Sequence, residues 1–444
     1  MLNPDSQVRN PLVPLARWGE EFKEIFSARV SERQLGFRYT WYLGALTLGT
    51  FTIQISTGIL LMLYYHPSIP QAYADMKDLH FVISSGMLLR NLHRWSAHTM
   101  VLLVFLHMAK VFYRGAYRPP RELNWIVGVT LLMLTLLLSY TGYLLPWDQL
   151  SYWGTTVGSH IMSSMPVIGE KLSFILLGGH SVNANALIRF YVLHTVILPL
   201  ALIMLIVLHL WRLHKDGGMH AEVAEEIGAN DAVPEGRTMA EGHSPPAGRT
   251  LPYWELLFRE TIGIEVLLVV LVWIALRWNA PLEQLADPTH TPAVAKAPWY
   301  FTGLQELLHY FPPFVAGIIL PGLIVAALVI IPFFNVNIRD ENLWHRSKST
   351  RLAILGIVVA ALSVLLISFH AWDTVAPIWI VAGAMLIASR SSQREERGFR
   401  RWLGFRALSF WIMTWFLMEA ATLTAVGTFF RGPGWLWIWP WNLK

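Results

Sequence analysis

The sequence contains no cysteine at all. The chain can therefore form no disulfide, hold no iron–sulfur cluster through thiolates and attach no haem through thioethers, so any such centre must lie on a partner. Charge is also scarce, because 14% of the residues are charged whereas a soluble domain carries about 25%. The net charge of +5 is spread over the chain without a dense basic face, so we expect no nucleic-acid partner.

The main feature of the sequence is a series of long apolar runs. Of 444 residues 54% are hydrophobic, and the runs are about 17–25 residues long, enough to cross roughly 30 Å of hydrocarbon as helix. Transmembrane β-barrels alternate polar and apolar residues and are excluded. The sequence predicts an all-α, polytopic transmembrane helical bundle of nine spans. These are residues 39–64, 90–113, 124–145, 187–212, 261–278, 314–334, 352–369, 375–389 and 407–429.

Basic residues set the predicted orientation. The segment before the first span is rich in arginine, the connection 146–186 has Lys171 alone, and the connections predicted inside are basic again. We therefore expect an integral protein of a bacterial inner (cytoplasmic) membrane, with its N-terminus in the cytoplasm and its C-terminus outside. Residues 1–38 lack an early apolar core, so no cleaved signal peptide is expected.

A hydrophilic, Gly- and Pro-rich stretch divides the chain into a four-helix and a five-helix half. The predicted parts are an N-terminal cytoplasmic segment (1–38), a four-helix domain (39–215), a polar linker (216–250), a C-terminal domain (251–389) and an additional helix with its tail (390–444). In the connection after the third span, the apolar run 166–178 suits a helix lying in the membrane interface.

Four histidines are predicted within the membrane, where ionisable groups are costly and indicate function. They are His93 and His107 on the second span and His194 and His209 on the fourth. Spacings of fourteen and fifteen residues place both imidazoles of each helix on one side, about 21–22 Å apart in height. Both helices run in the same direction, so two bis-imidazole sites follow, and such sites suit haem iron in electron transfer. The alternative is that these histidines hydrogen-bond neighbouring helices or line a proton path; His98 is assigned to packing.

Glycines and cations accompany the histidines. Two glycine pairs on the first and third spans repeat the fourteen-residue spacing: Gly44 with Gly58, and Gly128 with Gly142. Glycine lets a flat macrocycle approach a helix closely, although small residues are also common where membrane helices pack. Cations near the histidines could pair with haem propionates or simply extend to the membrane surface. They are Arg90, Arg94, Lys110 and Arg114.

Several long motifs occur in the same order as in a known family. They are RNLHRWSAH (90–98), PRELNW (120–125), TGYLLPWDQLSYWG (141–154), RFYVLHTVILPL (189–200), ADPTHTP (286–292) and PWYF (298–301). Over residues 30–335 the sequence resembles the cytochrome b family of quinol-oxidising bc-type complexes, and most closely the chloroplast-type cytochrome b plus subunit IV, here in one chain. The additional last helix has no counterpart in this resemblance.

The resemblance implies two non-covalent b-type haems. The family's ligands match His93, His107, His194 and His209, and its haem-packing glycines match the four glycines named above. The chloroplast-type branch attaches a further haem through a cysteine, but Tyr42 stands at that position. A covalently held haem is therefore not expected.

The resemblance also implies an outer, quinol-oxidising site. Its matching residues are Trp147, Asp148, Trp153, Gly154, Pro298, Trp299 and Tyr300. The family's proton-accepting glutamate is replaced by Pro298, so the motif reads A-P-W-Y and another base must take the quinol protons. Asp148, Glu306 and His309 are candidates. We favour Glu306, for which a solvated loop acid is the alternative, with Asp148 and Tyr300 as further catalytic candidates.

An inner, quinone-reducing site is implied at the end of the fourth span. His214, Lys215 and Glu255 could hydrogen-bond the quinone carbonyls and deliver protons, or His214 and Lys215 could be an ordinary basic helix end.

The expected function is therefore that of the di-haem cytochrome b subunit of a quinol:cytochrome c (or similar acceptor) oxidoreductase. The expected partners are a Rieske-type iron–sulfur protein, a cytochrome c subunit, quinol and quinone, membrane lipid and a second copy of the complex. One alternative is a di-haem membrane anchor that exchanges electrons between quinol and a dehydrogenase without bifurcation, and another is a transporter whose histidines line a proton route.

Overall fold

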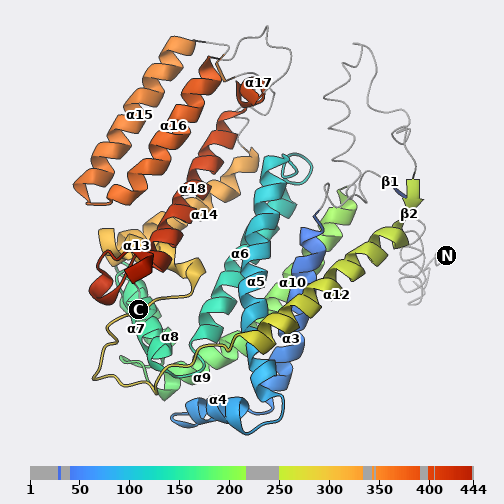
Figure 1. The fold of residues 1–444 in the computed structure, drawn as a ribbon, viewed down its shortest axis with the longest axis vertical. Coiled ribbons are helices and arrows are strands. Elements are labelled where there is room, and N and C mark those ends of the chain that lie inside the picture. Colours follow the sequence, from blue (N-terminus) through green and yellow to red (C-terminus); the bar gives the residue numbers. More distant parts are fainter. Residues whose placement is uncertain are drawn as a thin grey trace, which may run out of the picture. The chain divides into compact units, whose positions relative to one another are not determined.

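The computed structural model describes residues 29–31, 41–216, 250–333, 343–344, 347–390, 399–404 and 406–442. Most of the predicted N-terminal segment 1–38 and linker 216–250 lie outside these residues. Within them the fold is helical, apart from one short antiparallel pair of strands, β1 (Arg29–Ser31) and β2 (Thr250–Pro252). The structure confirms the predicted all-helical, polytopic class (Figure 1).

Eight helical segments of the described residues are long and apolar enough to cross a membrane. They are Leu43–Met62, Gly86–Tyr113, Glu122–Tyr143, Ala184–Lys215, Val315–Phe333, Lys348–Ser368, Trp372–Ser389 and Leu408–Phe429. Each coincides with a predicted span. The span predicted over 261–278 falls in α12 (Tyr253–Arg277), which is helical but is not among the eight. Glu260, Glu265 and Arg277 interrupt its apolar run.

The chain forms two compact units that do not follow chain order. The first unit consists of the described residues within 1–60, 87–116 and 207–280, and the second of those within 61–86, 117–206 and 281–444. The first unit therefore includes most of α3 (Leu43–Met62) and α5 (Gly86–Tyr113), together with the end of α10 (Leu198–Lys215) and α12.

In the first unit, α12 is held against α3 and α5 by a small residue and by a buried amide. Gly49 of α3 faces Ile264 of α12 so closely that any side chain at Gly49 would collide with it. Asn91 of α5 is fully buried and bonds the end of α12 twice: its amide donates to Ala275 O at 2.8 Å, and its oxygen accepts from Ala280 N at 2.8 Å. Buried polar groups require such partners, so Asn91 fixes where α12 ends.

In the second unit, connections that hydropathy leaves unassigned fold into short helices. These are α4 (Gln71–Phe81), α7 (Gln149–Ser163) and α8 (Gly169–Leu177). Helix α8 coincides with the predicted apolar run 166–178. Helix α7 begins at Asp148, whose carboxylate accepts from Ser151 N at 2.9 Å as an N-cap.

Two membrane helices of the second unit contain a π-helical turn before a proline. In η1 (Leu193–Ile197) the Leu198 N–H bonds Leu193 O, and Pro199 follows. In η2 (Val315–Ile319) the Leu320 N–H bonds Val315 O, and Pro321 follows. Proline lacks the N–H that an α-helix needs, so the backbone widens by one residue at these points.

The C-terminal part of the second unit is a layer of helices (Figure 1). Helices α15 (Lys348–Ser368) and α16 (Val375–Ser389) lie side by side, and α18 (Leu408–Phe429) contacts α16. Helix α18 also packs along α13 (Trp299–Tyr310), the most extensive helix–helix contact of the unit. The predicted additional helix therefore exists and packs against the segment with the A-P-W-Y motif.

Candidate functional site

Two of the four predicted membrane histidines face each other in the first unit. His107 lies on α5 and His209 on α10, with their ring centres 6.5 Å apart and their planes at 78°. Two imidazoles on opposite sides of a metal, each with a metal–nitrogen distance of about 2 Å and about 1 Å from nitrogen to ring centre, have ring centres roughly 6 Å apart. The pair therefore fits the axial positions of one iron.

The donor set suits a metal that brings its own equatorial ligands. Among the described residues no group of three or more histidines and carboxylates could hold a bare ion. Two facing imidazoles can serve as the protein ligands of a haem iron, since the porphyrin supplies the other four nitrogens. The residues present thus fit a b-type haem at His107 and His209.

His93 is oriented by a hydrogen bond of defined direction. Thr57 of α3 gives its hydroxyl proton to Ile53 O at 2.7 Å, and its oxygen lies 2.8 Å from His93 Nδ1. The hydroxyl has only one proton, so it accepts from His93 Nδ1–H. This leaves the lone pair on Nε2, the state in which a histidine ligates metal while its other nitrogen is held by a second group.

His194 is held in the same tautomer from α6 (Glu122–Tyr143). Its Nδ1–H lies 3.1 Å from Leu138 O, which can only accept, and 3.2 Å from the Thr141 hydroxyl, which donates to Leu137 O at 2.9 Å. His194 therefore also carries its lone pair on Nε2. His93 and His194 belong to different units.

The π-helical turn explains the unequal spacing of the two histidine pairs. His93 and His107 are fourteen residues apart, whereas His194 and His209 are fifteen apart. Turn η1 includes His194 and takes in one additional residue, so the fifteen-residue interval covers the rotation of fourteen α-helical residues. Pro199 is the sequence signal for this turn.

Three of the predicted glycines lie against imidazole rings. A methyl group at Gly44 would be 3.6 Å from His107 Cε1, and one at Gly58 would be 3.4 Å from His93 Cε1. Gly142 is tighter, because a methyl group there would lie 3.0 Å from both ring nitrogens of His194 and closer still to Cε1. Gly128 also lies on α6, within Glu122–Tyr143.

The predicted propionate partners have varied surroundings. Arg90 is buried and donates to Ala280 O at 2.9 Å. Arg94 is half-buried beside His93, and Lys110 lies over the Trp41 ring at 5.0 Å. Arg114 is exposed beyond the end of α5. His98, assigned to packing, has its ring 5.6 Å from that of Trp95.

The segments predicted to form the outer quinone site meet at Tyr140, which the sequence analysis did not single out. The Tyr140 hydroxyl of α6 donates to Gly154 O of α7 at 3.3 Å, and its ring meets Phe301 of α13 edge-on with centres 6.2 Å apart. Tyr300 and Trp299 adjoin Phe301 at the start of α13, and all three are half-buried. The aromatic pair in the motif S-Y-T-G-Y is the signal that could have identified this position.

Asp148 accepts several hydrogen bonds. Besides capping α7, it accepts from the Ser151 hydroxyl at 2.7 Å and from Glu283 N at 3.0 Å, and it is buried. The neighbouring Trp147 is buried with φ of 54°, and its carbonyl accepts from Ala286 N at 3.2 Å. Trp153 Nε1 donates to His290 O at 3.3 Å. The W-D motif thus joins α7 to the segment that follows α12.

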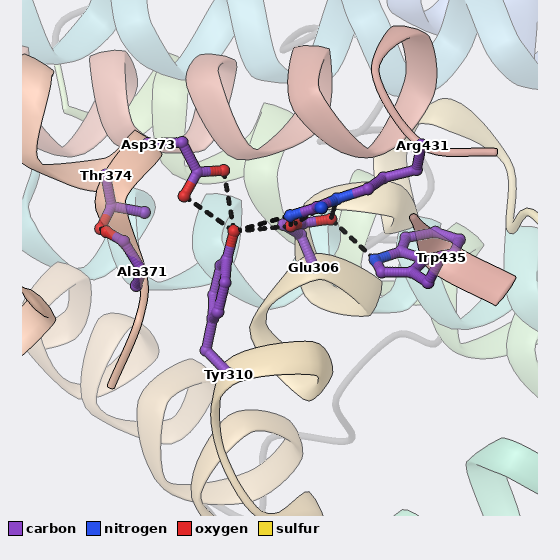
Figure 2. A network of polar contacts seen from close by, with 7 residues as sticks. All are labelled: Glu306, Tyr310, Ala371, Asp373, Thr374, Arg431 and Trp435. Atoms are coloured by element: carbon purple, nitrogen blue, oxygen red, sulfur yellow. Dashed lines mark hydrogen bonds and ion pairs between the residues drawn. The ribbon is translucent and has the colours of Figure 1, made fainter. Parts of the chain in front are cut away.

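Helix α13 carries the predicted base, Glu306, whose side chain is fully buried and contacts Arg431, Tyr310 and Trp435 (Figure 2). Pro298 precedes the helix as its N-cap residue and is buried, whereas His309 is exposed on another face. Arg431 forms an ion pair with Glu306, and Trp435 Nε1 donates to Glu306 Oε2 at 2.9 Å. We call Glu306, Tyr310, Asp373, Arg431 and Trp435 the Glu306 cluster.

Tyr310 joins two carboxylates within the Glu306 cluster. Its phenol oxygen lies 2.7 Å from Glu306 Oε1 and 2.7 Å from Asp373 Oδ1, and it accepts from Arg431 at 2.9 Å (Figure 2). Burial, followed by the hydrogen bonds and charges of the two carboxylates, raises the pKa of Tyr310. Tyr310 therefore stays protonated, with one proton to share between two acceptors.

The predicted inner quinone residues all lie in the first unit. His214 and Lys215 are exposed at the end of α10, and the Lys215 ammonium lies over Trp211 at 4.9 Å. Glu255 is paired with Arg259 one helical turn away at 2.9 Å. Within the described chain no hydrogen bond joins His214 to Glu255.

Comparison with known proteins places the chain in a family. Residues 31–217 match the model for cytochrome b/b6/petB, and residues 285–389 match that for the cytochrome b C-terminal part, b6/petD. Cytochrome b6 of Heliobacterium mobile is 46% identical over 191 residues, which are 43% of this chain and 89% of that protein. Cytochrome b6 of Synechocystis sp. is 42% identical over 175 residues, 39% of this chain and 79% of that protein.

A solved structure is similar along nearly the whole chain. A chain of a hyperthermophilic respiratory complex III superimposes with a TM-score of 0.60 and 25% identity, covering 93% of this chain and 97% of that one. The four histidines and the W-D motif lie in the first family match, and A-P-W-Y lies in the second. The chain belongs to the cytochrome b/b6 family, and it carries the b6-like and the petD-like parts in one polypeptide.

Proposed function

We propose that the chain is the haem-carrying subunit of a bc-type quinol oxidoreductase, with quinol oxidised at an outer site and quinone reduced at an inner one. The observation that carries the proposal is the His107–His209 pair, two imidazoles on separate membrane helices at the spacing of axial ligands. Membership of the cytochrome b family implies b-type haems.

Four imidazoles would hold two haems: His107 and His209 would ligate one, and the resemblance to the family implies His93 and His194 as ligands of the other. When bound, these haems would supply one-electron transfer. The chain's own contribution is orientation. Thr57 and Thr141 hold the Nδ1 atoms of His93 and His194, so that each ring presents Nε2.

At the outer site we propose that quinol binds where α6, α7 and α13 meet. Trp147, Trp153, Gly154, Trp299 and Tyr300 would form its wall, and Tyr300 would hydrogen-bond the quinol hydroxyl. Quinol gives up electrons only as it loses protons, so a base must lie nearby.

The candidate bases differ in the hydrogen-bond and ion-pair partners that they already have. Asp148 accepts hydrogen bonds from Ser151 and from the Glu283 backbone. Glu306 is bound by Arg431, Trp435 and Tyr310. That Glu306 is the base stays a prediction. Its contacts with Arg431, Trp435 and Tyr310 favour a role in fixing the position of α13.

At the inner site, we propose that His214 and Lys215 bind the quinone and supply protons to it. Both are exposed at the end of α10, where solvent can reprotonate them. Glu255 would act with them through its pairing with Arg259.

We further propose that the complex includes a Rieske-type iron–sulfur protein and a cytochrome c subunit and that it is a homodimer in the membrane. The similarity to a chain of a respiratory complex III supports this. The absence of cysteine requires a partner for any iron–sulfur centre.

Haem spectroscopy of the purified complex tests the ligand assignment. Four single variants, H93L, H107L, H194L and H209L, should each lose one of two b haems. Because paired ligands act as a unit, the double variant H107L/H209L should lose no more than either single variant. If H107L and H209L removed different haems, the assignment would fail.

A second experiment separates the proposed activity from a non-bifurcating anchor. With quinol present, a pulse of oxidant should transiently reduce the b haems if the two electrons of quinol take different routes. Oxidation of the haems by the same pulse would instead support the anchor.

A further inference from the structure

The C-terminal extension, residues 390–444, lies beyond both family matches, the second of which ends at residue 389. Among the described residues its helix α18 nonetheless makes the most extensive contact between two helices, with α13, which begins within the A-P-W-Y motif. Helix α18 packs along α13, and the chain after α18 turns back over the same helix (Figure 1).

The extension holds α13 along its length. Thr302, in the first turn after A-P-W-Y, hydrogen-bonds the Thr428 hydroxyl at 2.9 Å. A methyl group on Gly427 would lie 2.8 Å from Thr302 O, so the two helices are in direct backbone contact there. At the far end of α13, Arg431 binds Glu306 and Tyr310.

The extension also holds the segment that enters α13. Lys296 donates to Thr428 O at 2.9 Å, and Gly434 N donates to Ala293 O at 3.1 Å. Pro298, Trp299 and Tyr300 therefore lie between two anchored segments, both fixed by residues of the extension.

Arg431 is the centre of this arrangement. It is buried, and its guanidinium contacts both oxygens of the fully buried Glu306 while it also donates to the Tyr310 oxygen (Figure 2). A planar guanidinium that binds both carboxylate oxygens fixes orientation as well as distance, which an ammonium cannot do.

We propose that Arg431 is a positioning residue of the outer quinol site. Through Glu306 and Tyr310 it fixes the rotation and depth of α13, and thereby the Trp299 and Tyr300 side chains that begin this helix. The proposal rests on the proposed function. In this proposal the extension fixes the position of the A-P-W-Y motif, in which Pro298 stands in place of the family's glutamate.

The test uses the intact complex and measures haem reduction by dimethylnaphthoquinol after rapid mixing. In R431Q and E306Q we expect the quinol concentration for half-maximal rate to rise by up to roughly tenfold, because a displaced Tyr300 loses its hydrogen bond to quinol and one such bond changes affinity by about that factor. The haem spectrum and haem content should match the parent. R431K should recover only part of the loss, since lysine cannot bind both oxygens, and E306Q/R431Q should be no worse than either single variant.

Arg406 provides the matched control on the same extension. Its guanidinium stacks over Trp402 at 4.2 Å, and R406Q should leave the half-saturating quinol concentration unchanged. A purely structural role for Arg431 would lower the thermal stability and maximal rate of R431Q at an unchanged half-saturating concentration, and that result would overturn the proposal. If quinol did not reduce the haems of the parent complex at all, the proposed function itself would fail. If R431Q had the half-saturating quinol concentration of the parent, only the positioning role of Arg431 would be refuted.

Discussion

Gly142 offers the sharpest test of how the histidine pockets are built. An alanine methyl at this position would lie 3.0 Å from both ring nitrogens of His194, whereas atoms in contact settle at about 3.5–4.0 Å. The ring would have to withdraw by roughly 1 Å. Its Nδ1 is only 3.1 Å from Leu138 O and 3.2 Å from the Thr141 hydroxyl, so such a shift breaks at least one of these hydrogen bonds.

The expected cost combines two effects. Overpacking of this kind costs about 1–3 kcal/mol in stability. Loss of the group that orients a metal-bound histidine lowers metal affinity about 10–100-fold, or about 1.4–2.7 kcal/mol. G142A should therefore be purified with one b haem depleted, as measured by the haem-to-protein ratio and the reduced-minus-oxidised spectrum.

Gly58 is the matched control. A methyl group there would lie 3.4 Å from His93 Cε1 and 4.0 Å from Nδ1, which is close to ordinary contact, so G58A should retain both haems. Equal haem loss in G58A and G142A would refute this reasoning. It would mean that the glycines make room for the macrocycle, as the sequence suggested, and not for the imidazole.

Four further outcomes are expected. T57V removes the acceptor 2.8 Å from His93 Nδ1 and should lower the affinity of that haem about tenfold in titrations of the haem-depleted protein; unchanged affinity would contradict the tautomer assignment. N91L leaves the buried Ala280 N–H without its acceptor and should lower stability by about 1–3 kcal/mol, seen as a lower thermal midpoint, whereas an unchanged midpoint would show that this bond is dispensable. D148N keeps an oxygen that can cap α7 but replaces the oxygen that accepts from Glu283 N at 3.0 Å, so it should cost about 1–2 kcal/mol in stability and keep the pH profile of quinol oxidation; a changed profile would make Asp148 a base. Because the pKa of Tyr310 is raised in the folded protein, its contribution to stability is complete below its ordinary value of about 10 and falls above it, so Y310F should flatten the stability decline in alkaline unfolding experiments.

The sequence by itself determined the class of fold and the identity of the main candidate residues. Apolar length alone predicted all eight helices that the structure finds suitable for crossing a membrane. The spacing of four histidines indicated two bis-imidazole sites, because residues fourteen or fifteen apart return to one side of a helix. Both inferences use local information, namely the length of a run and the angle per residue.

Tertiary structure decided what each of these residues contacts. Only the folded chain shows that a π-helical turn containing His194 lies just before Pro199. This turn takes in one additional residue, so the fourteen-residue and fifteen-residue histidine spacings correspond to the same helical rotation. Only packing brings Arg431 to Glu306, since the two residues are 125 positions apart and no local pattern joins them. The chain specifies a residue's type and spacing, but the partner that orients its proton or carries its countercharge comes from a distant segment, and that partner is fixed only when the segments pack.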